Sequence, residues 1–541
     1  MISGRNLGQE KALFCVFGYL FPKIFSCNFI CLFLRLQINI NYNKNMNFQL
    51  IENTKTQAFA QKHSLLIPLT SKNLAEKMAL LTAEFGWSAA ILEDFKASTE
   101  EVQILYTQAD NALEKVILLG LGESATAEGL RKAMRLLVYK QKEKLGKNIV
   151  IDFGKLPEEL SKVALVEACT NAALLATYDI AKFKTKDKQP SVFSENIAFL
   201  LPSESHTLAQ KAVEKGEIIA STQQDIFDLV NLPVNRLNSL QLAEFMEKIG
   251  KEYSFGVRVM HLAEIKQLGM GGLVAVNQGS DTPATFTVME YKPTTSQPLK
   301  KVGLVGKGVT FDMGGISIKT SDGMWQMKCD MAGAAAVIGT MEAVARLQLP
   351  VHLIAVVPST DNMISGRAIC PGDIVNTYSG LTIEIEDTDA EGRVILADGL
   401  AYIKKNFEPD VLIDLATLTG ASVIALGYHA AALFTHNDEL AEQLAKAGTQ
   451  TSEKVWRLPL WDDYDKHIKS DMADVKNFGG RPAGAITAAK FLEKFTDKHP
   501  AWVHLDIAGV AFGDNPFSGA RSATAYGVRL LVEYITNLTA Q

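Results

Sequence analysis

Alternating apolar and polar positions divide the chain into two regions of repeated strand and helix patterns. In residues 46–205, an apolar run at 116–122 precedes a helical pattern at 127–142, and a run at 148–152 precedes a helical pattern at 157–178. Strands and helices that alternate in this way are typical of α/β domains. The pattern therefore predicts a smaller N-terminal α/β domain over residues 46–205.

A long helical pattern follows at 207–232 and ends before Pro233. We interpret 206–232 as a connecting helix and 233–541 as a catalytic α/β domain with a central mixed sheet, because strand and helix patterns alternate again after Pro233. The strands expected in this domain lie at 302–305, 351–357, 381–385, 411–415 and 502–507, and the helices at 333–347, 393–405 and 483–495.

Composition and charge narrow the classes of protein that these patterns allow. Apolar residues make up 47% of the 541 residues and charged residues 21%, which is usual for globular proteins with a large core. The formal net charge is −6, so bulk charge does not favour nucleic acid or an anionic membrane as the main partner. Cysteines are few and form no Cys-x-x-Cys pair, which favours a reducing compartment and excludes a finger-type zinc site.

The first 45 residues differ from the rest of the chain. They carry a net charge of +4, which leaves −10 for the remainder, and they hold three of the six cysteines. Their apolar centre, residues 12–36, is broken by Pro22-Lys23, and neither half reaches the roughly 20 residues of a membrane-spanning helix. Two hypotheses stay open: a signal or membrane anchor, or an extension upstream of a true start at Met46. The first predicts export or anchoring, and the second, which the Asn, Lys, Ile and Phe bias favours, predicts a cytoplasmic protein.

Four carboxylates and two cations follow the ends of predicted strands in the second domain. Catalytic groups of open α/β sheets gather at this edge, and oxygen-rich clusters favour hard or borderline divalent cations. Two divalent ions would neutralise four carboxylates, and the cations could then hold an anion or a developing oxyanion. Acidic, glycine-rich loops are also common on solvated surfaces. Spacing alone therefore does not decide between a metal site and an ordinary surface loop. The carboxylates are Asp312, Asp330, Asp389 and Glu391, and the cations are Lys319 and Arg393.

The sequence lacks the signatures of two other hydrolase classes. It contains no His-Glu-x-x-His motif, which removes the usual single-zinc protease. It contains no Gly-x-Ser-x-Gly elbow, which argues against an ordinary serine hydrolase.

Residues 387–394, Asp-Thr-Asp-Ala-Glu-Gly-Arg-Val, closely resemble the Asn-Thr-Asp-Ala-Glu-Gly-Arg-Leu signature of the leucine (cytosol) aminopeptidase family of dinuclear metallopeptidases. The resemblance is strong from about Asp225 to Val532, weaker over 46–205 and absent from 1–45. The chain departs from the signature at Asp387 and Val394. Further segments that resemble family motifs are 305–319, 327–337, 414–421 and 504–509.

The resemblance implies two divalent ions per subunit, manganese or zinc. By motif match, Lys307, Asp312, Asp330 and Glu391 would hold the more exchangeable ion, and Asp312, Asp389 and Glu391 the tighter one. The residue types alone would not select Lys307, because an amine must lose its proton before it can bind a metal.

The resemblance also implies a mechanism, in which the metal pair activates a hydroxide that attacks the first peptide carbonyl. Lys319 would stabilise the developing oxyanion, and Arg393 would hold a bicarbonate that acts as general base, since an arginine stays charged. The residues expected to contact substrate are Asp389, Thr417 and Leu418, with Met327, Thr417, Gly420 and Ala508 lining the pocket for the first side chain; the pocket residues would fit ordinary core positions equally well.

The predicted function is that of a metal-dependent leucyl aminopeptidase, which removes N-terminal leucine and other, mostly apolar, residues from peptides. The resemblance implies a homohexamer whose active sites face an interior cavity. A DNA-binding accessory protein on the same fold is the alternative, and the net charge of −10 after residue 45 argues against it. A membrane is expected as a partner only if residues 1–45 are a genuine anchor.

Overall fold

The computed structural model describes residues 46–52, 62–88, 90, 94–107, 112–186, 196–294, 299–514 and 521–540. Both hypotheses on residues 1–45 therefore lie outside the described residues. The residues described belong to one compact unit, 45–541. Among them, no helix is both long and apolar enough to cross a membrane.

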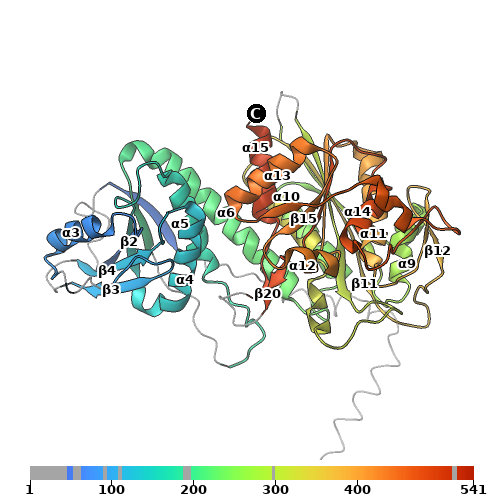
Figure 1. Ribbon diagram of the computed structural model, residues 1–541, viewed down its shortest axis with the longest axis horizontal. Coiled ribbons are helices and arrows are strands. Elements are labelled where there is room, and N and C mark those ends of the chain that lie inside the picture. The colour runs from blue at the N-terminus through green and yellow to red at the C-terminus, as the bar shows by residue number, and fades with distance from the viewer. Residues whose placement is uncertain are drawn as a thin grey trace, which may run out of the picture. The chain divides into compact units, whose positions relative to one another are not determined.

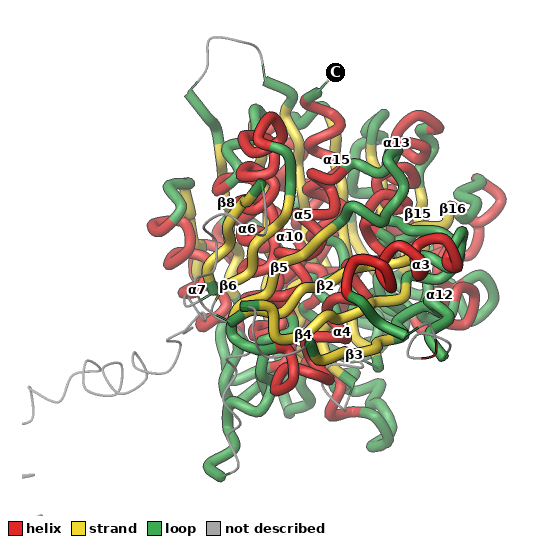
Figure 2. The backbone as a smooth tube through the Cα atoms, turned by 90° about the vertical axis from the view of Figure 1, so that its left-hand side faces the viewer, coloured by secondary structure: helices red, strands yellow, loops and turns green. Residues whose placement is uncertain are grey.

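The N-terminal part contains a six-stranded sheet with the order β1-β6-β5-β2-β4-β3. All neighbouring strands are parallel except β3 and β4, which are antiparallel. Figure 2 shows β6, β5, β2, β4 and β3 side by side in this order. Every residue of β2 is buried, as expected for a parallel strand covered on both faces. The strands are β1 (Asn47–Ile51), β2 (His63–Leu69), β3 (Val102–Tyr106), β4 (Leu113–Gly120), β5 (Asn148–Asp152) and β6 (Asn196–Leu200).

Three helices pack with this sheet: α3 (Leu74–Phe85), α4 (Ala127–Leu145) and α5 (Lys162–Leu175). The helix predicted at 157–178 is shorter at both ends. It begins at Lys162 because the Ser161 side chain accepts a hydrogen bond from the backbone N–H of Ala164, which caps the first turn.

The long helix predicted at 207–232 is confirmed as α6 (His206–Asn231), which packs against α5 and α10. It ends at Asn231 because Leu232 adopts an extended conformation before Pro233, and the proline ring disfavours the helical region for the residue before it. The Thr222 hydroxyl of α6 donates to Glu342 Oε1 at 2.7 Å inside the core.

The C-terminal part is built on a nine-stranded mixed sheet with the order β16-β15-β18-β14-β9-β11-β8-β7, and β10 pairs with β11. The pairs β18–β14, β14–β9, β9–β11, β10–β11 and β15–β16 are parallel, whereas β15–β18, β11–β8 and β8–β7 are antiparallel. The mixed α/β architecture is confirmed. The strands are β7 (Gly256–His261), β8 (Thr285–Tyr291), β9 (Lys301–Gly306), β10 (Gly308–Asp312), β11 (His352–Asn362), β14 (Val411–Ala416), β15 (Ala431–Phe434), β16 (Val455–Arg457) and β18 (Trp502–Asp506).

Helices α10 and α11 cover opposite faces of this sheet (Figure 1). Consecutive residues of a strand point to opposite faces: a Cβ on Gly306 would lie 2.6 Å from Ala334 Cα in α10, and the Val305 side chain packs against Gly399 in α11. Glycine at 306 therefore lets α10 approach the end of β9. The helices of this part are α7 (Ser239–Glu252), α8 (Leu262–Gln267), α9 (Gly271–Asn277), α10 (Ala332–Arg346), α11 (Glu391–Phe407), α12 (Gly420–Leu426), α13 (Asp438–Thr451), α14 (Gly484–Glu493) and α15 (Val528–Thr539).

The strand predicted at 381–385 lies outside the central sheet. It forms β13 (Thr382–Glu384), which pairs with β12 (Ile374–Asn376) and β17 (Val475–Lys476) in a three-stranded sheet. A short apolar run does not reveal which strands it will pair with, so this difference was not visible in the pattern. The remaining pair, β19 (Phe512–Gly513) and β20 (Ser522–Ala523), is antiparallel.

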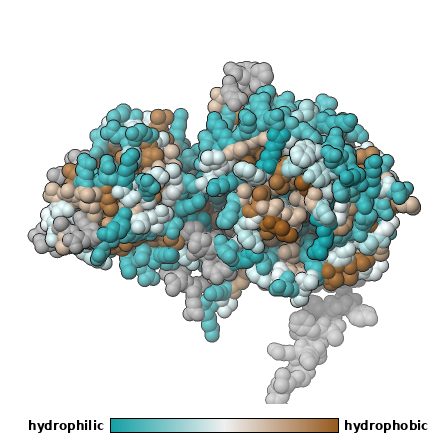
Figure 3. All heavy atoms as spheres, viewed as in Figure 1, coloured by the Kyte–Doolittle hydropathy of each residue, from teal (hydrophilic) through white to brown (hydrophobic). Residues whose placement is uncertain are grey.

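Part of the surface is apolar. Patches of apolar side chains interrupt the mostly hydrophilic face that Figure 3 shows. Among the described residues after α6, seven large apolar side chains are more than half exposed to solvent: Ile318, Trp325, Ile424, Tyr428, Trp456, Trp461 and Met472.

A buried carboxylate anchors α11 inside the core. Asp398 is completely buried; its Oδ1 accepts from the Tyr378 backbone N–H at 2.8 Å and its Oδ2 from the Leu273 N–H at 2.9 Å. Burial raises the pKa of Asp398 to about 7, although these backbone donors oppose the shift. Asp398 thereby connects α11 to α9 and to the residues that follow β12.

We expect the stability contribution of Asp398 to depend on pH. A carboxyl group has a pKa of about 3.9 when unfolded, so its neutral form stabilises the fold fully below pH 4, and this contribution is lost as the pH rises through about 7. The difference in thermal midpoint between wild type and Asp398→Asn, which does not titrate, should therefore shrink between pH 5 and pH 8. A difference that is constant across this range would contradict the prediction.

Candidate metal centre

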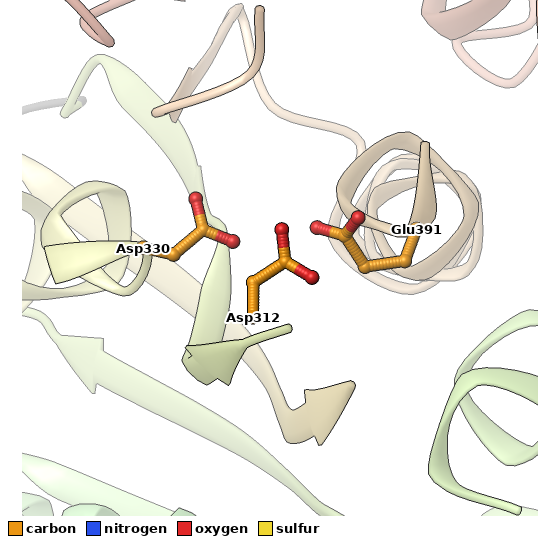
Figure 4. Close-up of side chains that lie close together, drawn as sticks. All are labelled: Asp312, Asp330 and Glu391. Atoms are coloured by element: carbon orange, nitrogen blue, oxygen red, sulfur yellow. The ribbon is translucent and has the colours of Figure 1, made fainter. Parts of the chain in front are cut away.

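Three acidic residues from separate elements meet at the carboxyl edge of the central sheet. Asp312 ends β10, Asp330 follows the short helix η3 (Met324–Cys329) before α10, and Glu391 begins α11. Figure 4 shows their carboxylates directed toward a common point. One oxygen of each lies within 4.8 Å of the others, and all three residues are buried. The fold thus brings together carboxylates that are up to 79 positions apart (312 to 391).

Two lysines offset part of the negative charge of this cluster. Lys307 Nζ lies 2.7 Å from Asp330 Oδ2 and 2.9 Å from Glu391 Oε1. Lys319 Nζ lies 2.6 Å from Asp312 Oδ2 and also contacts the Asp389 carboxylate. A Cβ on Gly392 would lie 2.5 Å from Lys307 Cε, so glycine at this position lets Lys307 run beside the first turn of α11.

Burial and the charges of neighbouring groups act against each other on the pKa values of this cluster, and the result differs from group to group. Burial raises the pKa of Asp330 well above its usual value, and Glu391 adds to the shift while Lys307 opposes it. Burial alone would raise the pKa of Glu391, but Lys307 and Lys319 hold it below its usual value. Burial alone would lower the pKa of Lys307, but the carboxylates around it raise it. The pKa values of buried, mutually charged groups are thus strongly shifted at this cluster, as is common where chemistry takes place.

These residues fit divalent metal ions. Within the described part of the chain, the Lys307 ammonium group is the close polar partner of Asp330 Oδ2 and Glu391 Oε1, and Glu391 Oε2 has no side-chain hydrogen-bond donor. Buried carboxylate oxygens without hydrogen-bond donors are costly unless a cation compensates them. Oxygen ligands with one amine suit hard or borderline ions such as manganese or zinc better than soft ones. Lys307 could join them only as the neutral amine, so an ion must replace its proton.

Asp389 lies beside this group. Its carboxylate contacts Lys319, burial raises its pKa to about 6, and it is not one of the three clustered carboxylates. Asp387 Oδ1 accepts the Asp389 backbone N–H at 2.9 Å. An asparagine oxygen could accept the same bond, so the departure from the signature at Asp387 preserves this turn.

Arg393 lies in the first turn of α11 and is almost fully buried. Its Nη1 donates to the Asn477 carbonyl at 2.8 Å, while its Nε has no hydrogen-bond partner among the residues that the structure describes. Burial lowers the pKa of Arg393 to about 10, so the side chain stays charged at neutral pH. A buried guanidinium with an unused donor fits a small anion.

The residues predicted to contact substrate follow the ends of β14 and β18. Thr417 donates its hydroxyl to Asp330 Oδ1 at 2.8 Å, and its carbonyl accepts from Lys307 Nζ at 2.9 Å. The backbone N–H groups of Leu418 and Ala508 both donate to Asp506 Oδ1 at 3.2 Å. One buried carboxylate therefore holds the segments of Leu418 and Ala508 together.

Two further residues predicted to line the pocket lie on short helices. Met327 is partly buried in η3, three positions before Asp330, and Gly420 begins α12. A Cβ on Gly420 would meet no atom within 4 Å, so the space beside it is open.

Two buried asparagines that the sequence analysis did not identify support the site. Asn362 Nδ2 donates to Asp312 Oδ1 at 2.8 Å and to the Thr388 carbonyl at 3.0 Å. Asn362 ends β11, so the rule that catalytic groups follow strand ends could have identified it. Asn477 contacts the backbone of residues 386–390, and no local motif marks it.

A buried cluster of carboxylates and lysines at the carboxyl edge of an α/β sheet defines a metal-dependent enzyme. Two family models match the chain: "Cytosol aminopeptidase family, catalytic domain" over residues 226–532 and "Cytosol aminopeptidase family, N-terminal domain" over residues 71–187. The chain belongs to the cytosol aminopeptidase family, which confirms the resemblance. The predicted domain limits at 205 and 232 stay predictions.

Similar proteins agree with this assignment. Proteins named "Probable cytosol aminopeptidase" are 45% identical over 493 residues in Chloroherpeton thalassium and 46% identical over 486 residues in Chlorobium limicola. These matches cover 88% and 87% of this chain and 96% of each relative.

Solved structures give the same result. A mutant of tomato leucine aminopeptidase has a TM-score of 0.80 at 31% identity, covering 91% of this chain and 96% of that one. The bottromycin maturation enzyme BotP in complex with Mn has a TM-score of 0.76 at 30% identity, covering 88% and 99%. The chain is a metal-dependent aminopeptidase that acts on peptides. None of these comparisons supports the alternative of a DNA-binding accessory protein.

Proposed function

We propose that the chain removes N-terminal leucine and other, mostly apolar, residues from peptides with the help of two divalent ions, manganese or zinc. Lys307, Asp312, Asp330, Asp389 and Glu391 would hold the ions. The observation that carries this proposal is the group of three buried carboxylates within 4.8 Å, two of whose members contact the same lysine. The Mn complex of BotP supports manganese as one of the ions.

When bound, the two ions would supply Lewis-acid activation of water and of the peptide carbonyl. The residues of the chain would orient the substrate and stabilise charge. Lys319, whose ammonium group lies beside Asp312 and Asp389, would donate to the oxyanion that forms on the carbonyl. Arg393 would hold a bicarbonate as general base, because its charged guanidinium cannot accept a proton itself.

Residues near the ends of β14 and β18 would position the peptide. Backbone groups of Asp389, Thr417 and Leu418 would bind the substrate main chain. Asp506 supports this role because it holds the Leu418 N–H, and its other oxygen, Oδ2, accepts the Thr419 hydroxyl at 2.6 Å. The side chain that is removed would lie in a pocket formed by Met327, Thr417, Gly420 and Ala508.

Hydrolysis of leucine p-nitroanilide tests the proposed function. The purified protein with Mn²⁺ should hydrolyse it, and excess chelator should abolish the reaction. N-acetyl-leucine p-nitroanilide should react at least about 100-fold more slowly, because the free amine is needed for correct orientation. Aspartate p-nitroanilide tests the preference for apolar residues, and it should be hydrolysed more slowly than leucine p-nitroanilide. If the metal-loaded protein leaves leucine p-nitroanilide intact, or hydrolyses the acetylated compound equally well, the proposal is wrong.

We further propose a cytoplasmic homohexamer with active sites that face an interior cavity. The exposed apolar side chains, among them Ile424 and Trp456, support burial against another copy of the chain. Sedimentation of the purified protein as a monomer would contradict this assembly.

A further inference from the structure

We propose that Asn477 is a positioning residue for the reaction: it sets the conformation of the loop at 386–390 that leads into Glu391, and it orients Arg393. This inference rests on the proposed roles of these residues. Asn477 follows β17 and is completely buried.

The Asn477 side chain contacts both ends of the loop. Its Oδ1 accepts the backbone N–H groups of Glu386 at 2.8 Å and Asp387 at 3.2 Å. Its Nδ2 donates to the carbonyls of Asp387 at 2.6 Å and Ala390 at 3.3 Å. Four backbone groups of a five-residue segment are thus satisfied by one amide.

The backbone of Asn477 adds two contacts to the same region. Its N–H donates to the Glu384 carbonyl at 2.9 Å, which extends the pairing of β13 with β17. Its carbonyl accepts from Arg393 Nη1 at 2.8 Å. One residue therefore links the strand before the loop, the loop itself and the arginine after it.

The loop depends on this support from outside. No side chain caps the start of α11 at Ala390, and buried backbone groups need partners. A second asparagine, Asn362, donates to the Thr388 carbonyl of the loop and to Asp312 Oδ1. Two asparagines thus contact the loop, one bonded to Asp312 and the other to Arg393.

Only a primary amide provides an acceptor and two donors on one short side chain. Aspartate has the same size and would still accept the two N–H groups, but its second oxygen would face the carbonyls of Asp387 and Ala390. It would also place a negative charge beside the ligand loop. Alanine would remove the Asn477 partner of all four backbone groups, and within the described residues only the Asp387 carbonyl would keep another donor, the Ala390 N–H at 3.3 Å.

The test compares Asn477→Ala and Asn477→Asp with Asn277→Ala. Asn277 is also buried, and its Nδ2 donates to the Thr282 carbonyl at 2.8 Å and to Thr360 Oγ1 at 3.0 Å, so it controls for the loss of a buried amide in the same part of the chain. The readouts are kcat and KM for leucine p-nitroanilide, the affinity for Mn²⁺ by calorimetry, and the thermal midpoint in chelator.

We expect both Asn477 variants to lose about 10- to 100-fold in Mn²⁺ affinity and about 100-fold in kcat, with a smaller change in KM. Asn277→Ala should lower the thermal midpoint but leave kcat and Mn²⁺ affinity within about threefold. If Asn477→Ala does not fold, Asn477→Asp decides the question. The inference is overturned if a folded Asn477 variant keeps wild-type kcat and Mn²⁺ affinity, or if Asn277→Ala loses as much. A wild-type protein that neither binds Mn²⁺ nor hydrolyses the substrate would instead refute the proposed function.

Discussion

Glu391→Gln is expected to abolish metal-dependent hydrolysis while the protein stays folded. The glutamine has the same shape, and its remaining carbonyl oxygen can still face Lys307 Nζ, which lies 2.9 Å from Glu391 Oε1. What disappears is one negative charge beside Asp312 and Asp330, and with it an anionic ligand shared by both proposed ions. We expect kcat/KM for leucine p-nitroanilide to fall at least about 1000-fold, which corresponds to about 4 kcal/mol in the activation barrier.

Calorimetric titration with Mn²⁺ should show a loss of affinity in Glu391→Gln that parallels the loss of rate. Glu342→Gln is the matched control, because Glu342 is also completely buried but contacts Thr222 and Arg346. That variant should be less stable and yet keep kcat and Mn²⁺ affinity. If Glu391→Gln retains either property, Glu391 is not a metal ligand.

Lys319→Ala is expected to lower kcat by about 100- to 1000-fold, the usual cost of removing one donor to an oxyanion. The same variant should not weaken metal binding. The ammonium group lies 2.6 Å from Asp312 Oδ2, so its removal leaves the carboxylates more negative and should keep Mn²⁺ affinity unchanged or increase it. A lower kcat with undiminished Mn²⁺ affinity is the result expected of a catalytic lysine. The loss of a lysine that only stabilised the site would lower both.

Lys476→Ala provides the comparison for Lys319→Ala. Lys476 pairs with Glu386 of the same loop at 2.9 Å, so the variant removes an equal charge nearby without removing a group directed at the cluster. Its kcat should stay within about threefold of wild type, because exposed ion pairs contribute little. A Lys319→Ala variant with wild-type kcat would refute the role proposed for Lys319.

The elements that could be predicted from sequence are those whose pattern is local. Strand β5 has the predicted bounds, and α4, α6 and α10 lie within a few residues of theirs, because apolar periodicity and capping residues act over one or two turns. Helix α11 begins at Glu391, two positions earlier than predicted. Its start depends on tertiary contacts of the preceding loop, which periodicity does not detect.

The candidate site shows the same limit. Asp312, Asp330 and Glu391 could be selected because they follow strands or precede helices and match family motifs. Asn477 could not, because its partners at 386–390 lie about 90 positions away in the sequence. A single asparagine carries no signature until the pairing of β13 with β17 brings it against the loop.

The sequence by itself determined that this is an α/β protein of the cytosol aminopeptidase family and which carboxylates and cations are candidates for chemistry, because residue types, local periodicity and motif order are properties of the linear chain. Only the tertiary structure decided that Asp312, Asp330 and Glu391 converge. Asp389 lies beside this group and contacts Lys319. The tertiary structure also decided that β13 leaves the central sheet and that buried asparagines hold the ligand loop. The physical reason is that side-chain distances depend on strand pairing and helix packing between distant segments, which sequence spacing does not encode.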